Sequence, residues 1–307
     1  MSRMLDNERQ RVLGRWMVFC AAVSWGTSAT LARHVFEHVP ALYVAAIRLT
    51  IATTLMLPWL ALRRPASLRI PLRDVPYFVI LGVFGVAAVQ GSYYYAISRL
   101  GVGVAIVLQY LAPICIVLFD LMRGRAVGWR MMVAVVLALA GTVLLVGSVD
   151  ARVLHASAFD FGVGIASAVI FAFYILYSQR GLRRHPPETV LFYSFAVGGI
   201  CWLSILTPAR ILATPYSLQT WAMFLALGVF STLLPFSLLY AGLRRLPATE
   251  ASVIATTEPV VAIIAARVFL GESLHALQYP GAALVIAAAL MASSRGPESQ
   301  GVVAEPH

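Results

Sequence analysis

The chain has 307 residues, of which 60% are hydrophobic and only 12% are charged. A soluble domain carries about a quarter charged residues, so this composition excludes an ordinary water-soluble enzyme or binding domain. The net charge of +10 could indicate nucleic-acid binding, but every basic residue is an arginine and most lie at the ends of apolar stretches. We therefore expect a lipid bilayer as a partner and no nucleic acid.

Ten apolar stretches follow one another along the chain, and each is close to the roughly 20 residues that a helix needs to cross a bilayer. Backbone groups must be satisfied within the membrane, and the stretches do not alternate apolar and polar residues as barrel strands do. We predict an all-α integral membrane protein with ten transmembrane helices at approximately 16–33, 41–62, 75–98, 102–121, 130–149, 160–179, 188–207, 219–241, 249–269 and 277–293.

The arginines predict how these spans are oriented. If the N-terminus is cytoplasmic and the spans alternate, 17 of the 23 arginines fall in cytoplasmic segments and 4 on the opposite side. Arg48 and Arg267 fall inside spans. This bias follows the positive-inside rule. We predict a multi-pass protein of the bacterial inner (plasma) membrane with both termini in the cytoplasm.

The sequence also repeats itself weakly at an offset of 146 residues. The matching landmarks are Pro40 and Pro186, Tyr94 and Tyr240, Arg99-Leu100 and Arg245-Leu246, and Pro113 and Pro259. We predict a first five-helix repeat at 10–149, a second at 156–293, and a disordered cytoplasmic tail at 294–307. Because five is odd, the repeats should be inverted around a central cavity, as in many transporters. The alternative is that duplication only stabilises a helical bundle.

Four segments carry a family resemblance: WGTSATLARHV at 25–35, Arg48 in the second span, YLAPICIVLF at 110–119 and ATTEPVVAIIAARVFLGESL at 255–274. They resemble the EamA branch of the drug/metabolite transporter superfamily, and within it the YddG-like amino-acid exporters. The resemblance implies ten helices, cytoplasmic termini, a central cavity and export of amino acids or other metabolites. The first repeat departs from the pattern, because Ala112 stands where the second repeat has Glu258.

Two prolines are candidate hinges. We expect Pro113 and Pro259 near the middle of the fourth and ninth spans, where a proline removes one N–H and frees the carbonyl four residues earlier. Those carbonyls belong to Gln109 and Ala255, and we include Gln109 among the candidate solute-binding residues. The alternative is that the membrane helices tolerate these prolines by local repair.

Two charged residues lie deepest in the predicted spans. An ionisable group costs at least about 2.5–3.5 kcal/mol in hydrocarbon, so Arg48 and Glu258 should face a cavity or a partner. They could bind the carboxylate and the ammonium of a zwitterion, or Glu258 could carry a proton. They could instead pair with each other and only order the bundle. Thr256, two residues before Glu258, joins the candidate set.

Aromatic and amide side chains supply the remaining candidates for a cavity wall. Gln90 and Tyr94 are four residues apart and share a helix face. Such a wall suits aromatic or aliphatic amino acids, or lipophilic cations held by cation–π contacts. The alternative for each ring is packing or lipid contact. The full set is Trp25, Gln90, Tyr94, Phe171, Tyr174 and Tyr240.

No catalytic or ATP-binding motif is present in the sequence, so we expect no enzyme activity. His34 and His38 have the spacing of metal ligands but no acidic third ligand follows, so we expect neither a metal nor another cofactor. We predict a secondary transporter that exports amino acids, aromatic or hydrophobic ones included, or related metabolites by alternating access. The alternatives are efflux of drugs and lipophilic cations, or a non-transporting scaffold. One monomer has enough helices to enclose a cavity.

Overall fold

The computed structural model describes residues 2–36, 38–147, 151–206, 208–271 and 273–294. Within these ranges all regular structure is helical, with no strand. The predicted tail at 294–307 lies outside the described residues apart from Ser294.

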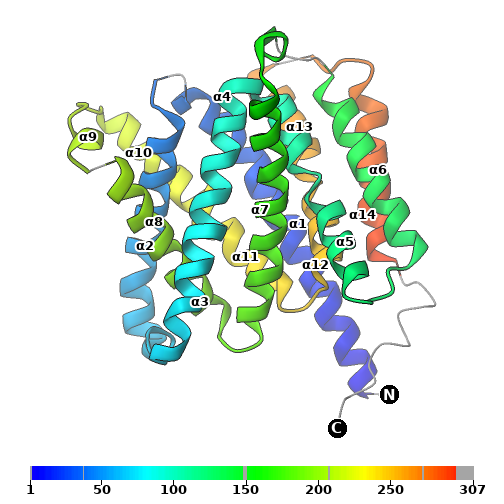
Figure 1. The fold of residues 1–307 in the computed structure, drawn as a ribbon, viewed down its shortest axis with the longest axis horizontal. Coiled ribbons are helices and arrows are strands. Elements are labelled where there is room, and N and C mark those ends of the chain that lie inside the picture. Colours follow the sequence, from blue (N-terminus) through cyan, green and yellow to red (C-terminus); the bar gives the residue numbers. More distant parts are fainter. Residues whose placement is uncertain (1, 37, 148–150, 207, 272, 295–307) are drawn as a thin grey trace.

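The helices of the two halves follow one another in a similar order (Figure 1). The first half contains α1 (Ser2–Phe36), α2 (Ala41–Arg63), η1 (Pro65–Leu68), η2 (Leu72–Asp74), α3 (Val75–Ile80), η3 (Leu81–Ala87), α4 (Ala88–Gln109), α5 (Ala112–Met122) and α6 (Trp129–Val146). The second contains η4 (Ala151–His155), α7 (Ala158–Leu182), α8 (Pro187–Leu206), α9 (Pro208–Leu212), α10 (Leu218–Ala226), η5 (Leu227–Leu233), α11 (Leu234–Leu243), α12 (Ala248–Ala255), α13 (Glu258–Leu270) and α14 (Gln278–Ser293).

Seven helical stretches of the described residues are long and apolar enough to cross a membrane. They are Ala41–Arg63, Leu72–Met122, Trp129–Val146, Ala158–Leu182, Pro187–Leu206, Leu218–Leu243 and Ala248–Phe269. The apolar α14 is shorter, and α1 is 35 residues long with a polar start. Length and composition therefore establish a multi-pass helical protein, but they do not by themselves establish ten spans.

The stretch Leu72–Met122 bends sharply near its middle. A straight helix of 51 residues would be about 77 Å long, more than twice the hydrocarbon core of a bilayer. Gly101 interrupts it with φ 79° and ψ 162°, a conformation that is open mainly to glycine. Figure 1 shows the chain rising through α3 and α4 and returning through α5.

The third helix of each half contains a π-helical segment at the same place. The two segments are η3, with the sequence LGVFGVA, and η5, with the sequence LGVFSTL, and they begin 146 residues apart. The shared LGVF was not among the landmarks used to predict the repeat. Within η5 the Thr232 hydroxyl donates to the carbonyl of Leu227, five residues earlier, as suits a π-turn.

The two π-segments also pack in equivalent ways. A Cβ atom at Gly82 would lie 2.5 Å from Cβ of Val197 in α8, and one at Gly228 would lie 2.6 Å from Cγ2 of Ile51 in α2. Val197 and Ile51 are themselves 146 residues apart. Each glycine therefore allows an equivalent close helix approach, so the duplication extends from the sequence to the packing.

The predicted hinge prolines each follow a short turn within a long helical stretch. The helix α4 ends at Gln109 and α5 begins at Ala112, so Pro113 is in the first turn of a new helix. In the same way α12 ends before Thr256, and Pro259 is in the first turn of α13. Proline needs no helical partner for its nitrogen at that position. The residues just before each of these first turns keep nearly helical dihedral angles, so both long stretches continue through the proline with a local interruption of the α-helical bonding. The role of the two prolines as hinges stays a prediction.

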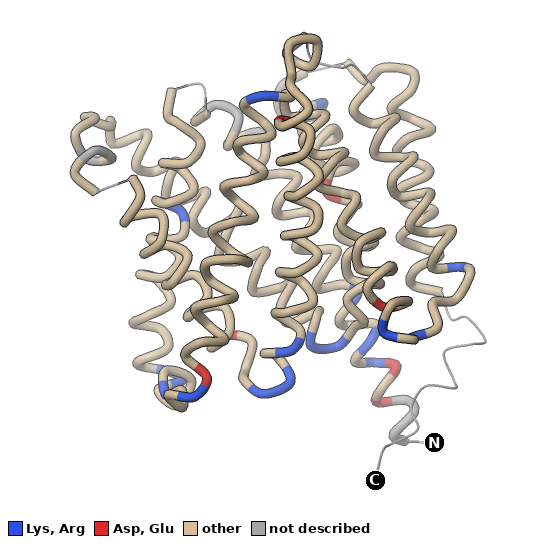
Figure 2. Tube along the Cα trace, viewed as in Figure 1, with Lys and Arg blue, Asp and Glu red and all other residues tan. Residues whose placement is uncertain are grey.

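The first long helices of the two halves, α1 and α7, run in opposite directions. Figure 1 shows α1 rising from the N-terminal end of the bundle and α7 descending toward it. Figure 2 shows most arginines gathered at that same end, which we call the arginine-rich end.

Candidate functional site

The buried guanidinium of Arg48 marks the candidate site. Its residue is only 8% exposed, on the inner side of α2. Nη1 donates to the Ser231 hydroxyl at 3.1 Å and Nη2 donates to Oε1 of Gln90 at 3.3 Å. The side chain therefore joins α2 to η5 and to α4.

All partners of this guanidinium are neutral. Within the described part of the chain no carboxylate lies within 4.0 Å of Arg48, and its Nε has no hydrogen-bond partner. A buried charge without a counter-ion is unfavourable unless a ligand compensates it. Guanidinium groups bind carboxylates in a forked geometry, so this site is suited to an anionic group of a solute.

Aromatic rings form a wall beside Gln90. A small cavity of about 30 Å³ is lined by Val86, Val89, Gln90, Phe171, Tyr174 and Phe236. Trp25 packs edge-on against Phe236 with ring centroids 5.0 Å apart, and its Nε1 donates to the carbonyl of Ser231 at 3.2 Å. The predicted residues Trp25, Arg48 and Gln90 therefore surround one site, together with the rings of Phe171 and Tyr174.

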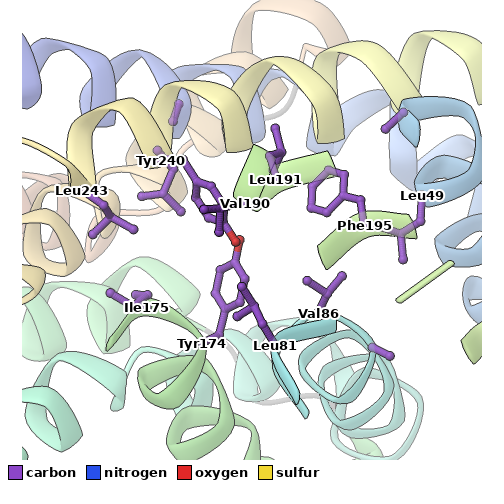
Figure 3. Packing of buried hydrophobic residues seen from close by; sticks show 14 of the residues in the cluster. Leu49, Leu81, Val86, Tyr174, Ile175, Val190, Leu191, Phe195, Tyr240 and Leu243 are labelled. Carbon is purple, nitrogen blue, oxygen red and sulfur yellow. The ribbon is translucent and has the colours of Figure 1, made fainter. Parts of the chain in front are cut away.

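Two tyrosines meet at the edge of this wall. Figure 3 shows the hydroxyls of Tyr174 and Tyr240 pointing toward each other, with ring centroids 6.0 Å apart. The Tyr240 hydroxyl pairs with Ser178 at 3.0 Å, whereas the buried Tyr174 hydroxyl has no hydrogen-bond partner of good geometry among the described residues. Tyr240 lies behind Tyr174 and does not line the cavity.

The carboxylate of Glu258, at the start of α13, has its own set of neighbours. The Tyr110 hydroxyl donates to its Oε2 at 3.0 Å. Glu258 is the first residue of α13, where the helix N-terminus favours a negative charge. Its backbone lies against Gly26, because a Cβ there would be 2.7 Å from the carbonyl oxygen of Glu258. Arg48 and Glu258 have different partners and form no ion pair.

Three other predicted residues lie away from the cavity. The ring of Tyr94 packs against Phe36, with centroids 5.7 Å apart. The Thr256 hydroxyl donates to the Val253 carbonyl of its own helix at 2.6 Å. Gln109 is the last residue of α4 and has no side-chain hydrogen bond to the described residues. The structure does not bring these three together with Arg48.

Sequence reasoning missed two residues of the two sites, Ser231 and Tyr110, and left Phe236 out of the candidate set although it is the repeat counterpart of Gln90. Ser231 lies in the LGVFST copy of the repeated LGVF segment. Tyr110 is the counterpart of Thr256. Following the repeat from Thr256 would have singled out Tyr110.

A charged cluster joins helices at each end of the bundle. At the arginine-rich end, Glu250 is 1% exposed and accepts from Arg11 at 2.9 Å and Arg15 at 2.6 Å. At the opposite end, Asp160 accepts from Arg99 at 3.1 Å and Tyr95 at 2.9 Å. Both clusters join helices from different halves.

The chain resembles known transporters along nearly its whole length. It matches the EamA-like transporter family over residues 12–147 and again over 161–294. The threonine/homoserine exporter RhtA of Escherichia coli strain K12 is 30% identical over 281 residues, which are 89% of this chain and 88% of that protein. YicL of Salmonella typhimurium strain LT2, an uncharacterized inner membrane transporter, is 27% identical over 288 residues, covering 91% and 95%.

The fold is shared with a solved crystal structure at a TM-score of 0.75 and 22% identity, which covers 91% of this chain and 96% of that one. The two family matches together span most of the described helices and follow the duplication seen in the packing. The chain therefore belongs to the EamA-like transporter family, and it is a multi-pass membrane transporter of that type.

Proposed function

We propose that this transporter exports amino acids and that Arg48 holds the solute carboxylate. The single observation that carries the proposal is the buried guanidinium with neutral partners only and an unpaired Nε. A carboxylate is the group that such a site lacks. The relationship to a threonine/homoserine exporter supports small neutral amino acids as the first solutes to test. The aromatic wall supports hydrophobic or aromatic ones as the second.

Ten spans in two inverted repeats fit this function. The ten consist of α1, α2, the two arms of the stretch bent at Gly101, α6, α7, α8, the α10–α11 stretch, the α12–α13 stretch and α14. With the arginine-rich end in the cytoplasm, both termini are cytoplasmic and the inner membrane is the location. The opposite directions of α1 and α7 support the inversion.

Alternating access would use the helix breaks as hinges. The turns before Pro113 and Pro259 interrupt the backbone hydrogen bonds of the fourth and ninth spans, so bending there costs little. The cavity of about 30 Å³ has no room for an amino acid. Binding therefore requires the rings around Phe236 to separate.

Glu258 is proposed to carry the coupling proton. It has no basic partner among the described residues, and the Tyr110 hydroxyl is its only hydrogen-bond donor there. Its position at the start of α13, beside a helix break, would let protonation affect the hinge. Glu258 and Arg48 have different hydrogen-bond partners and form no ion pair with each other.

Counterflow in proteoliposomes tests the proposal. Vesicles that contain the purified protein are loaded with unlabelled threonine. Their uptake of labelled threonine, homoserine, phenylalanine and a lipophilic cation is then compared with the uptake by protein-free vesicles. We expect saturable uptake of at least one amino acid. Uptake of the cation alone, by monodisperse protein, would instead support the second candidate function, cation efflux against the aromatic wall with Glu258 as the binding charge.

A further inference from the structure

A second cavity lies between the two halves, at the arginine-rich end. Its volume is about 690 Å³, within the range of small-molecule sites, and it is enclosed by α1, α2, α8, η5 and α11. We propose that it is the cytoplasmic vestibule of the transporter and that it concentrates carboxylate-bearing solutes before they reach Arg48. This inference rests on the proposed function for the identity of the solute, but the vestibule itself can be tested separately.

The cavity lies on the same side of α2 as the binding site. Leu55 and Trp59 follow Arg48 by seven and eleven residues, which places all three on one helix face. Arg48 is 8% exposed, whereas Leu55 is 40% and Trp59 is 50% exposed. This face of α2 is therefore closed around Arg48 and opens about 10–16 Å farther along the helix.

The rim of the cavity is strongly basic. Arg64, Arg244 and Arg245 all line it, against the single carboxylate of Glu188. Arg64 lies 3.6 Å from Glu188, and Arg245 donates to Gln10 at 2.8 Å. Arg244 is exposed and has no hydrogen-bond partner among the described residues. A cleft lined by one sign of charge raises the local concentration of the opposite sign, so anions are favoured here.

The equivalent region at the other end of the bundle is filled. Met56 and Ser237 line the open cavity, and their counterparts at the offset of 146 are Trp202 and Gly91. A Cβ at Gly91 would lie only 3.0 Å from the indole ring of Trp202, so the indole packs directly against α4.

A second counterpart carries a much larger side chain than the cavity residue it matches. Ala241 of the cavity corresponds to Tyr95, whose hydroxyl donates to Asp160. The buried indole N–H of Trp202 has no partner among the described residues, so no hydrogen bond holds this ring in place. One end is therefore open while its counterpart is closed, as alternating access between inverted halves requires.

The competing occupant is an acyl chain of the bilayer, because Leu55 and Trp59 also face outward. Charge complementarity on the rim and the shared face with Arg48 favour a water-filled vestibule. A water-soluble reagent distinguishes the two, because it reaches a hydrated cavity but not one filled by lipid.

The test places a single cysteine in the cavity. Cys20, Cys115 and Cys201 are first replaced by alanine, and Ser237→Cys is introduced in this background. Inside-out vesicles are treated with a negatively or a positively charged methanethiosulfonate, both membrane-impermeant. We expect the anionic reagent to react on the order of ten-fold faster, in line with electrostatic focusing in charged clefts.

Two sets of arginine variants identify the source of this preference. Arg64→Gln combined with Arg244→Gln should bring the ratio of the two rates close to one. The matched control is Arg183→Gln combined with Arg184→Gln, which removes the same charge from the exposed end of α7 and should leave the ratio unchanged. A wild-type ratio at or below one, or equal effects of both double variants, would overturn the anion-selective vestibule.

Two further outcomes separate the vestibule from the proposed function. If neither reagent labels Ser237→Cys while a denatured sample is labelled fully, lipid fills the cavity and the inference fails. If the anionic reagent is preferred but excess threonine or phenylalanine gives no protection, the vestibule holds and the amino-acid proposal fails. Gly91→Cys, probed in right-side-out vesicles, should react much more slowly than Ser237→Cys.

Discussion

Arg48 in α2 and Ser194 in α8 occupy equivalent places in the two halves, 146 residues apart, but their surroundings differ. Arg48 bonds to Ser231 and Gln90. The Ser194 hydroxyl donates to the Leu191 carbonyl of its own helix at 3.0 Å and carries no charge. The counterparts of Ser231 and Gln90 are Gly85 and Phe236, which have no polar side-chain atom. The helix arrangement is thus duplicated, whereas the polar site occurs in only one of the two equivalent places.

The difference separates helix packing, which the two halves share, from side-chain chemistry, which they do not. Glycines at equivalent positions reproduce the helix packing in both halves, as at Gly82 and Gly228. Side-chain chemistry then distinguishes the halves, because one buried guanidinium is enough for one solute carboxylate. A second one would add an uncompensated charge within the membrane.

The largest effect is expected from Arg48→Gln. Losing a hydrogen-bonded charge pair to the solute costs about 1.5–3 kcal/mol, or roughly 10–150-fold in affinity. Counterflow of the preferred amino acid should fall by this factor through a higher half-saturation concentration. Ser194→Ala is the matched control in the other half and should stay close to wild type. The Tm of Arg48→Gln should not fall below that of the wild type, because the substitution removes an uncompensated charge. A large drop in Tm would indicate a structural role instead.

The packing symmetry can be broken at either π-segment. Gly82→Ala and Gly228→Ala should each lower the free energy of unfolding by about 1–3 kcal/mol, because the new methyl group overpacks a close contact. Gly162→Ala, where no atom lies within 4 Å of the added carbon, should be neutral or stabilising. Thermal unfolding in one detergent compares all three. If only one of the two π-segment variants is destabilised, the packing of the halves is not equivalent.

The next effect comes from Glu258, which stands where the first half has Ala112. Glu258→Gln should slow export driven by a pH gradient by roughly ten-fold, the change that corresponds to about 1.4 kcal/mol. Counterflow without a gradient should stay near the wild-type rate, because the proton is then not needed for exchange. If both rates fall together, Glu258 binds the solute and does not carry the proton.

The smallest effect concerns the partner of that carboxylate. Tyr110→Phe removes one hydrogen bond, worth about 1 kcal/mol or roughly five-fold in gradient-driven rate. Its counterpart Thr256→Val should be close to neutral, because the Thr256 hydroxyl bonds only within its own helix. Equal losses in the two variants would contradict a special role for Tyr110.

Much of the fold could be predicted from the sequence, because membrane helices leave long apolar stretches. The stretch predicted at 41–62 is α2 at Ala41–Arg63, and the one at 130–149 is α6 at Trp129–Val146. The sequence predicts local interruptions at Pro113 and Pro259, and the structure has a short turn before each. Proline restricts the local backbone, but whether a helix bends or ends depends on the neighbouring helices.

The site was predictable only in part. Arg48 was identifiable because an arginine in an apolar stretch is costly. Its partner Ser231 was not, since a serine in an apolar run also suits close helix packing. That Arg48 and Glu258 bond different partners is a property of tertiary packing, and it leaves no local pattern in the sequence.

The most direct test of the central claim compares threonine with threoninol, which has a hydroxymethyl group in place of the carboxylate. Dissociation constants for both are measured by calorimetry on the purified wild type and on Arg48→Gln. The account predicts that the wild type prefers threonine by about 10–150-fold and that Arg48→Gln binds both about equally. The same preference for threonine in wild type and variant would contradict it, because the carboxylate would then be held elsewhere.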